Sequence, residues 1–186
     1  MRRLTILLVA ALALAGCGEE EGDRATGSGY GYELPEGWEE VSGLAEFEAI
    51  GFNSDSVSRA EPEEGFATNV NVILETSLAA SLDVDRYSRA GLRLLRHPER
   101  LSGEARTIFE RIGATDFSET EEVVLDGEDA RSTDYSSDQG GRALRLRVVS
   151  AIRDGTAYNI TFSALRTHFA EDIEAMNEVV GSWEWR

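Results

Sequence analysis

The segment from Leu144 to Leu165 constrains the fold most strongly, because its pattern predicts an antiparallel hairpin around Asp154-Gly155. Apolar and polar residues alternate along both arms, as in strands with one buried face. The apolar residues are Leu144, Leu146, Val148 and Ile152 on the first arm and Tyr158, Ile160 and Phe162 on the return arm. The segment therefore predicts the centre of an antiparallel sheet.

The length of the turn decides which residues of this hairpin share a face, since a shift of one residue inverts every side chain. A two-residue loop would pair Val148 with Thr161 and mix apolar with polar positions. A three-residue loop, Arg153-Asp154-Gly155 with Gly155 left-handed, pairs Val148 with Ile160. We therefore predict the longer loop.

The opposite face of the predicted hairpin is polar. It carries Arg145, Arg147, Asn159 and Thr161. A sheet covered by helices on both faces favours strands that are apolar on both sides. We therefore expect part of this polar face to be solvated.

The remaining pattern predicts one α+β domain over residues 30–186. Further strands are expected at residues 30–34, 47–52, 66–75, 119–125 and 128–136, with a polar loop at 53–65. Helical spacing of apolar residues predicts helices at 83–96, 101–112 and 169–180, and Gly113 and Gly181 end the last two. Trp183 and Trp185 follow in a short terminal strand, and we expect them to pack in and around the core.

Residues 1–16 are predicted to be a signal peptide that takes no part in the fold. Arg2 and Arg3 precede an uncharged segment, Leu4–Gly16, which is shorter than the roughly 20 residues that span a bilayer. The ending Leu14-Ala15-Gly16-Cys17 resembles the lipobox of bacterial lipoproteins, which implies lipid attachment at Cys17 and cleavage before it. The alternative is an ordinary signal peptide with an incidental cysteine.

Residues 17–29 are predicted to form a flexible acidic tether, because they contain no large apolar residue. Cys17 is the only cysteine, so an intramolecular disulfide is excluded. We accordingly expect an extracytoplasmic protein anchored to the cell membrane by its lipid.

Four segments of the chain resemble the PsbP-like fold, and within it the LpqN-type lipoproteins of actinobacteria. They are Tyr32–Trp38, Asn69–Val72, Asp126–Ala130, and Asp154-Gly155 with Tyr158 and a last helix that ends in Ser182-Trp183. The resemblance implies a twisted antiparallel meander with packed helices, in an α/β/α sandwich. It also implies a binding or accessory protein without a catalytic residue.

The charged residues of the chain exclude several kinds of partner and several reaction types. The formal net charge of −17 at pH 7 opposes binding to nucleic acid. All 18 basic residues are arginines, so Schiff-base chemistry, Ser-Lys dyads and a P-loop lysine are excluded. We expect no cofactor and a monomeric chain.

Residues capable of catalysis or metal binding are sparse. His97 and His168 are the only histidines, and each is expected at a helix end rather than beside a nucleophile. The acidic pair Asp83/Asp85 lacks the spacing of a calcium loop, so we predict no metal site. We assign no catalytic residue.

One group of arginines stands out from the acidic background. Arg86, Arg89, Arg93 and Arg96 fall on one stripe of the predicted helix at 83–96. We call these four residues the arginine stripe. They are either a solvated face neutralised by nearby acids or, together with Arg145 and Arg147, a docking surface for an anionic partner.

The sequence as a whole therefore predicts a non-catalytic binding or accessory module of the cell envelope, with an envelope protein as its partner. Two alternatives remain open. A cavity lined by tryptophans and carboxylates would favour a small hydrolase or lyase. A long, dry cavity would instead favour a carrier of an apolar ligand between sheet and helix.

Overall fold

The structure is a computed structural model that describes residues 23–41, 54–76, 78–79 and 81–186. Its centre is a seven-stranded antiparallel sheet with strand order β3-β4-β5-β9-β8-β7-β6. The strands are β3 (Glu39–Val41), β4 (Ser54–Arg59), β5 (Asn69–Glu75), β6 (Glu121–Leu125), β7 (Glu128–Gln139), β8 (Arg142–Arg153) and β9 (Thr156–Leu165). A smaller sheet has the order β1-β2-β10, formed by β1 (Arg24–Gly27), β2 (Tyr30–Glu33) and β10 (Glu184–Trp185).

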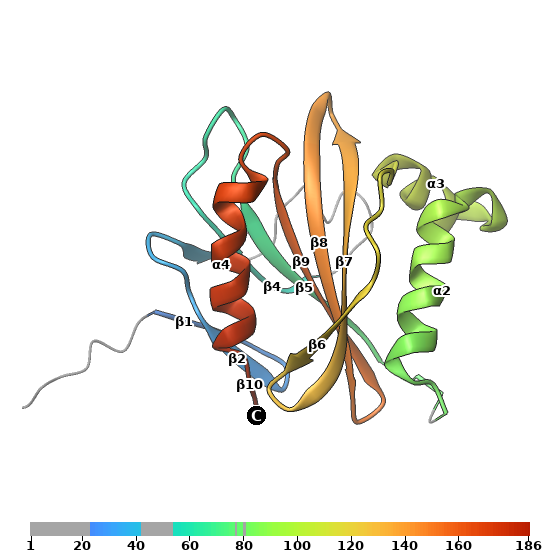
Figure 1. Ribbon diagram of the computed structural model, residues 1–186, viewed down its shortest axis with the longest axis horizontal. Coiled ribbons are helices and arrows are strands. Elements are labelled where there is room, and N and C mark those ends of the chain that lie inside the picture. Colours follow the sequence, from blue (N-terminus) through green and yellow to red (C-terminus); the bar gives the residue numbers. More distant parts are fainter. Residues whose placement is uncertain (1–22, 42–53, 77, 80) are drawn as a thin grey trace, which may run out of the picture.

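Helices cover both faces of the large sheet (Figure 1). Helix α4 (Phe169–Gly181) packs on one face together with the small sheet. Helices α2 (Val84–Arg96) and α3 (Gly103–Ile112) lie on the other face, joined by the short 3₁₀ helix η1 (Pro98–Arg100). The predicted α+β fold with an α/β/α arrangement is confirmed.

Strands β6 to β9 form the predicted meander through three tight turns. Asp126-Gly127, Gly140-Gly141 and Asp154-Gly155 each place two residues at positive φ between the strands. Two consecutive residues of this kind match the twist of a hairpin with a two-residue loop. The meander therefore follows from local turn chemistry.

The three-residue loop predicted for the β8–β9 hairpin is wrong. Val148 pairs with Thr161 and Arg153 pairs with Thr156, so the loop is Asp154-Gly155 alone. The apolar residues of the two arms face different helices. Residues 144, 146 and 148 face α2 and α3, whereas residues 158, 160 and 162 face α4. Because each face of the sheet has its own core, apolar residues on the two arms do not need to share a face.

With this register, the polar residues predicted to share one face of the hairpin lie on two different faces. Arg147 pairs with Phe162, and its guanidinium lies 5.9 Å from the ring centre of Phe169 on the α4 side. Asn159 and Thr161 lie on the opposite face, toward α2. The arginines and the uncharged polar residues therefore belong to different layers.

The small sheet packs through an aromatic stack. The rings of Tyr30 and Tyr32 are nearly parallel to Trp183, at centroid distances of 4.4 and 5.8 Å. The two tyrosine hydroxyls bond Ser56 and Ser58 of β4 at 2.8 Å. Trp183 is 3% exposed, so its expected role in the core is confirmed.

Two predictions at the N-terminal side are wrong. Strand β4 lies within residues assigned to a polar loop, because its serines face the tyrosine hydroxyls and hide the usual apolar alternation. Strand β1 lies within residues assigned to the tether; it pairs with β2 and buries Ala25 completely. The strand predicted at 47–52 and the tether before Asp23 lie outside the described residues.

The turn at Gly155 allows a direct test. Gly155 has φ of +74°, and a Cβ added there meets no atom within 4 Å. Gly155→Val should therefore lower the free energy of unfolding by about 1–3 kcal/mol through backbone strain alone. Gly155→Asn should lower the free energy of unfolding less than Gly155→Val does, because asparagine tolerates the left-handed conformation. Urea unfolding of both variants measures the difference, and equal midpoints for all three proteins would contradict the turn geometry.

Candidate functional site

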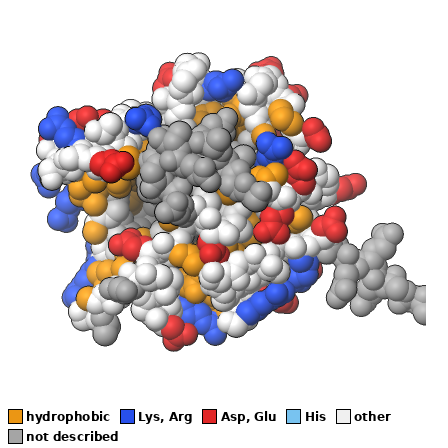
Figure 2. All heavy atoms as spheres, turned by 180° about the vertical axis from the view of Figure 1, so that it is seen from behind, with side chains coloured by type: hydrophobic (Ala, Val, Ile, Leu, Met, Phe, Trp, Pro, Cys, Tyr) orange, Lys and Arg blue, Asp and Glu red, His pale blue; other side chains and the backbone are white. Residues whose placement is uncertain are grey.

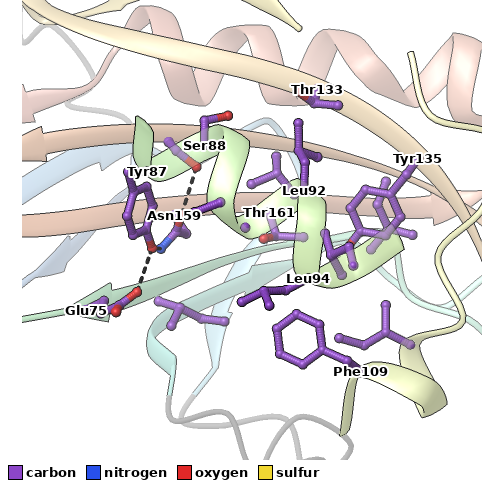
Figure 3. Close-up of a pocket in the computed structure, with 18 of the residues that line it drawn as sticks. Glu75, Tyr87, Ser88, Leu92, Leu94, Phe109, Thr133, Tyr135, Asn159 and Thr161 are labelled. Carbon is purple, nitrogen blue, oxygen red and sulfur yellow. Dashed lines mark hydrogen bonds between the residues drawn. The ribbon is translucent and has the colours of Figure 1, made fainter. Parts of the chain in front are cut away.

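A cavity of about 450 Å³ lies between α2 and the sheet, with α3 at one end (Figure 3). Strands β5, β9, β8 and β7 supply its floor. Its volume falls within the range of small-molecule sites, which is roughly 300–1,000 Å³.

The cavity exists because α2 does not pack tightly on the sheet. None of the residues of α2 is fully buried. Polar contacts hold the helix at this distance. Arg131 of β7 bonds the carboxylate of Asp85 at 2.6 Å, and the hydroxyl of Tyr87 bonds Glu75 of β5 at 2.9 Å. At the far end, the guanidinium of Arg96 lies 4.7 Å from the ring centre of Phe117.

The N-terminus of α2 is set by local sequence. Asp83 caps the helix by accepting a hydrogen bond from the backbone of Arg86 at 2.8 Å. The hydrogen bond from Arg131 lowers the pKa of Asp85 below its ordinary value, so Asp85 is ionised at neutral pH. The helix is thus fixed at its start by two carboxylates.

Most of the cavity wall is apolar. The helices contribute Leu92, Leu94 and Leu95 near the end of α2, together with Phe109 and Ile112 of α3. The sheet contributes Ile73, Leu146 and Val148. These side chains form an apolar surface that is already shielded from bulk water. The apolar part of a ligand can pack against it.

A chain of hydrogen bonds crosses the polar part of the floor. Ser150 donates to the side-chain oxygen of Asn159 at 2.8 Å. The Asn159 amide donates to the hydroxyl of Tyr87 at 2.7 Å, and Tyr87 donates to Glu75. Figure 3 shows Glu75, Tyr87 and Asn159 directed toward one another. Burial raises the pKa of Tyr87, and Glu75 raises it further, so the hydroxyl stays protonated.

Asn71 differs from this connected group. Its side chain lines the same cavity and is 1% exposed. Neither its amide nitrogen nor its oxygen has a hydrogen-bond partner among the described residues. Leaving a buried polar group unpaired costs about 1–3 kcal/mol, so the unpaired Asn71 amide lowers the stability of the folded protein.

The arginine stripe lies away from the cavity, on the exposed side of α2. Figure 2 shows basic side chains along the edge that α2 and α3 form. Arg86 contacts Asp83 at 3.4 Å, with both side chains more than half exposed. The structure thus brings the four predicted residues together on one surface.

Arg145 and Arg147 do not join this surface. Arg147 makes two hydrogen bonds to Asp134, at 2.7 and 3.0 Å. Arg145 bonds the side chain of Asp116 at 3.0 Å. Both arginines are therefore engaged with acids of this chain, on the face of the sheet opposite α2. Cys17, the predicted lipid site, lies outside the described residues.

The histidines occupy the expected helix ends, where His97 contacts Glu99 at 3.2 Å and His168 precedes α4. Within residues 23–41, 54–76, 78–79 and 81–186, no three metal-ligating side chains form a cluster. No helix in these ranges is long and apolar enough to cross a membrane.

Sequence reasoning did not single out Glu75, Tyr87 or Asn71 as site residues. The one available signal was asparagine at positions 69 and 71, within a strand otherwise rich in valine and isoleucine. Buried asparagines in a central strand are unusual, because the amide needs partners that a sheet face does not supply.

Comparisons with known proteins concern the fold. No protein-family model matches the chain, and no curated protein matches it in sequence. The cyanobacterial PsbP protein CyanoP from Synechocystis is similar in structure, with a TM-score of 0.59 and 17% identity over 93% of this chain and 99% of that protein. LpqN from Mycobacterium tuberculosis, described as involved in cell envelope biogenesis, has a TM-score of 0.55 and 12% identity over 89% of this chain and 86% of LpqN. The chain therefore has a PsbP-like fold.

Proposed function

We propose that this chain is a lipid-anchored, extracytoplasmic binding module that holds a small, largely apolar ligand between α2 and the sheet. The observation that carries this proposal is the cavity of about 450 Å³ beneath a helix without a fully buried residue. Small-molecule sites are typically concave and mostly apolar, with a few oriented polar groups, and this cavity has that character. Of the alternatives open from the sequence, the cavity favours the ligand carrier.

The chemistry of the lining supports a binding role over a catalytic one. Glu75 is the one carboxylate among the described lining residues, and it is engaged with Tyr87. General acid–base catalysis works best with a group whose pKa lies near the working pH, and the pKa of Tyr87 is raised by burial, away from neutrality. The tryptophans that would have favoured a hydrolase or lyase are Trp38, Trp183 and Trp185, which pack on the α4 side.

The proposed location depends on the N-terminal sequence. The lipobox resemblance at Leu14–Cys17 supports lipid anchoring, which makes the membrane a partner through Cys17. The shared fold with LpqN, a protein described as involved in cell envelope biogenesis, supports the same compartment.

Filling the cavity tests the proposed function. Thr161 lines the cavity floor and makes no side-chain hydrogen bond to a described residue, so Thr161→Phe adds volume without breaking such a bond. N-phenyl-1-naphthylamine, a neutral dye that fluoresces in apolar sites, should bind the parent protein. The variant should bind the dye at least about tenfold more weakly, because the ring occupies the space that the dye needs.

A matched variant separates occlusion from general damage. Thr156→Phe changes the same residue type at the end of the same strand, outside the cavity lining. It should leave dye affinity within about twofold. Equal dye binding by the parent protein, the Thr156 variant and a folded Thr161 variant would contradict a ligand site in this cavity.

Docking through the arginine stripe is a second candidate function. Arg86, Arg89, Arg93 and Arg96 are exposed together on a chain with a strongly negative net charge. Opposite charge steers partners to such a surface, and salt weakens the attraction. The occupant that fits is an acidic segment of an envelope protein.

Charge reversal distinguishes docking from simple neutralisation. Arg89→Glu with Arg93→Glu should change the free energy of unfolding by no more than about 0.5 kcal/mol per site, since both side chains are exposed. Recovery of a protein partner in pull-down experiments should fall in the variant and in raised salt. A variant that unfolds earlier yet retains its partner would contradict docking and favour neutralisation of nearby acids.

A further inference from the structure

We propose that the cavity selects a neutral ligand whose polar end carries a hydrogen-bond donor beside an acceptor, as in a carboxamide, and that Asn71 recognises this end. The inference rests on the proposed ligand-binding function and names the class of ligand.

The first argument is the position of Asn71 in the floor. It pairs with Val57 on one side and Thr161 on the other, in the interior of the sheet. Its side chain is 1% exposed and lines the cavity, and both polar atoms of its amide lack a partner among the described residues. An amide in this setting still has its donor and its acceptor available.

The second argument is that the other asparagine of the floor and the tyrosine beside it already use their polar groups. Asn159 uses its oxygen for Ser150 and its nitrogen for Tyr87. Tyr87 in turn donates to Glu75. The hydrogen bonds among these side chains hold them in position, whereas the amide of Asn71 can bind a polar group of a ligand. The two asparagines therefore have different roles in the same floor.

The third argument concerns charge. The described cavity lining contains no arginine or histidine, and it contains the carboxylate of Glu75. An anionic ligand would be desolvated here without a cation to compensate it. A neutral carboxamide can instead form two antiparallel hydrogen bonds with the Asn71 amide while its apolar body packs against residues such as Leu146 and Val148.

Three probes with the same alkyl body test this selectivity: octanamide, methyl octanoate and octanoate. Octanamide offers both donor and acceptor, methyl octanoate offers only acceptors, and octanoate is charged at pH 7. By calorimetric titration of the purified protein in detergent-free buffer, octanamide should bind at least about tenfold more tightly than either of the others.

Substitutions at two asparagines of β5 locate the effect. Asn71→Leu should remove the preference for octanamide over methyl octanoate while keeping the apolar contacts. Asn69→Leu is the matched control, because Asn69 is also buried and has an unpartnered oxygen but does not line the cavity. It should leave the preference within about twofold of the parent. If Asn71→Leu does not fold, Asn71→Val provides the same test with a residue suited to strands.

The outcomes separate this inference from the proposed function. Retained preference for octanamide in a folded Asn71 variant would overturn recognition by Asn71. Equal binding of octanamide and methyl octanoate by the parent protein would overturn the ligand class but leave the cavity as a binding site. Failure of the parent protein to bind N-phenyl-1-naphthylamine and all three probes would overturn both.

Discussion

Replacing Trp183 by alanine should lower the free energy of unfolding by about 3–5 kcal/mol, a large part of the stability of a domain of this size. Trp183 is 3% exposed and stacks on Tyr30 and Tyr32, so its loss leaves a void beside these two rings. Urea unfolding followed by circular dichroism measures the change.

Trp183→Phe refines this prediction. The indole nitrogen of Trp183 has no hydrogen-bond partner among the described residues, so phenylalanine loses volume but no such bond. Trp183→Phe should therefore lower the free energy of unfolding clearly less than Trp183→Ala does. A loss below about 1 kcal/mol for Trp183→Ala would mean that the aromatic stack contributes little to holding the small sheet.

Replacing Cys17 by alanine should abolish incorporation of labelled palmitate and release the protein from the membrane. The resemblance of Leu14–Cys17 to a lipobox implies acyl chains on this single cysteine, and no other thiol is available in the chain. The fold should persist, because the buried core residues of the described chain begin at Ala25. Metabolic labelling and membrane fractionation test the anchor.

The matched control is Ser28→Ala, outside the lipobox and in the turn between β1 and β2. It should be labelled and fractionate as the parent protein does. Palmitate on the Cys17→Ala protein would contradict lipid attachment at this residue, whatever the location of the chain.

The sequence predicts well the features that local chemistry determines. Asp83 and Gly113 delimit the helices α2 and α3 as expected, through a side-chain cap and a left-handed terminus. The glycine turns predict the meander, because few residues other than glycine, asparagine and aspartate accept positive φ.

The wrong predictions have one cause. They concern features that depend on contacts between segments far apart in the sequence. The β8–β9 register depended on two separate cores, and a single strand pair does not reveal how many layers cover it. Strand β4 depended on tyrosine hydroxyls from β2 meeting its serines, and the composition of that segment resembles a loop.

The cavity was named only as an open alternative, because its existence depends on how far α2 stands from the sheet. Periodicity identifies the inner residues of α2 but not whether they reach the sheet. That distance is set by contacts between segments far apart in sequence, Asp85 with Arg131 and Tyr87 with Glu75. The candidate site therefore could be found only in the folded chain.

Titration with N-phenyl-1-naphthylamine, followed by two-dimensional amide NMR, tests most directly whether this cavity is a ligand site. We predict saturable shifts concentrated at residues that line it on β5, β9 and α2, including Asn71, Thr161 and Tyr87. Amides around Trp183, on the far side of the sheet, should move little. Saturable shifts centred on Trp183, or no saturable shift at any residue, would contradict the account.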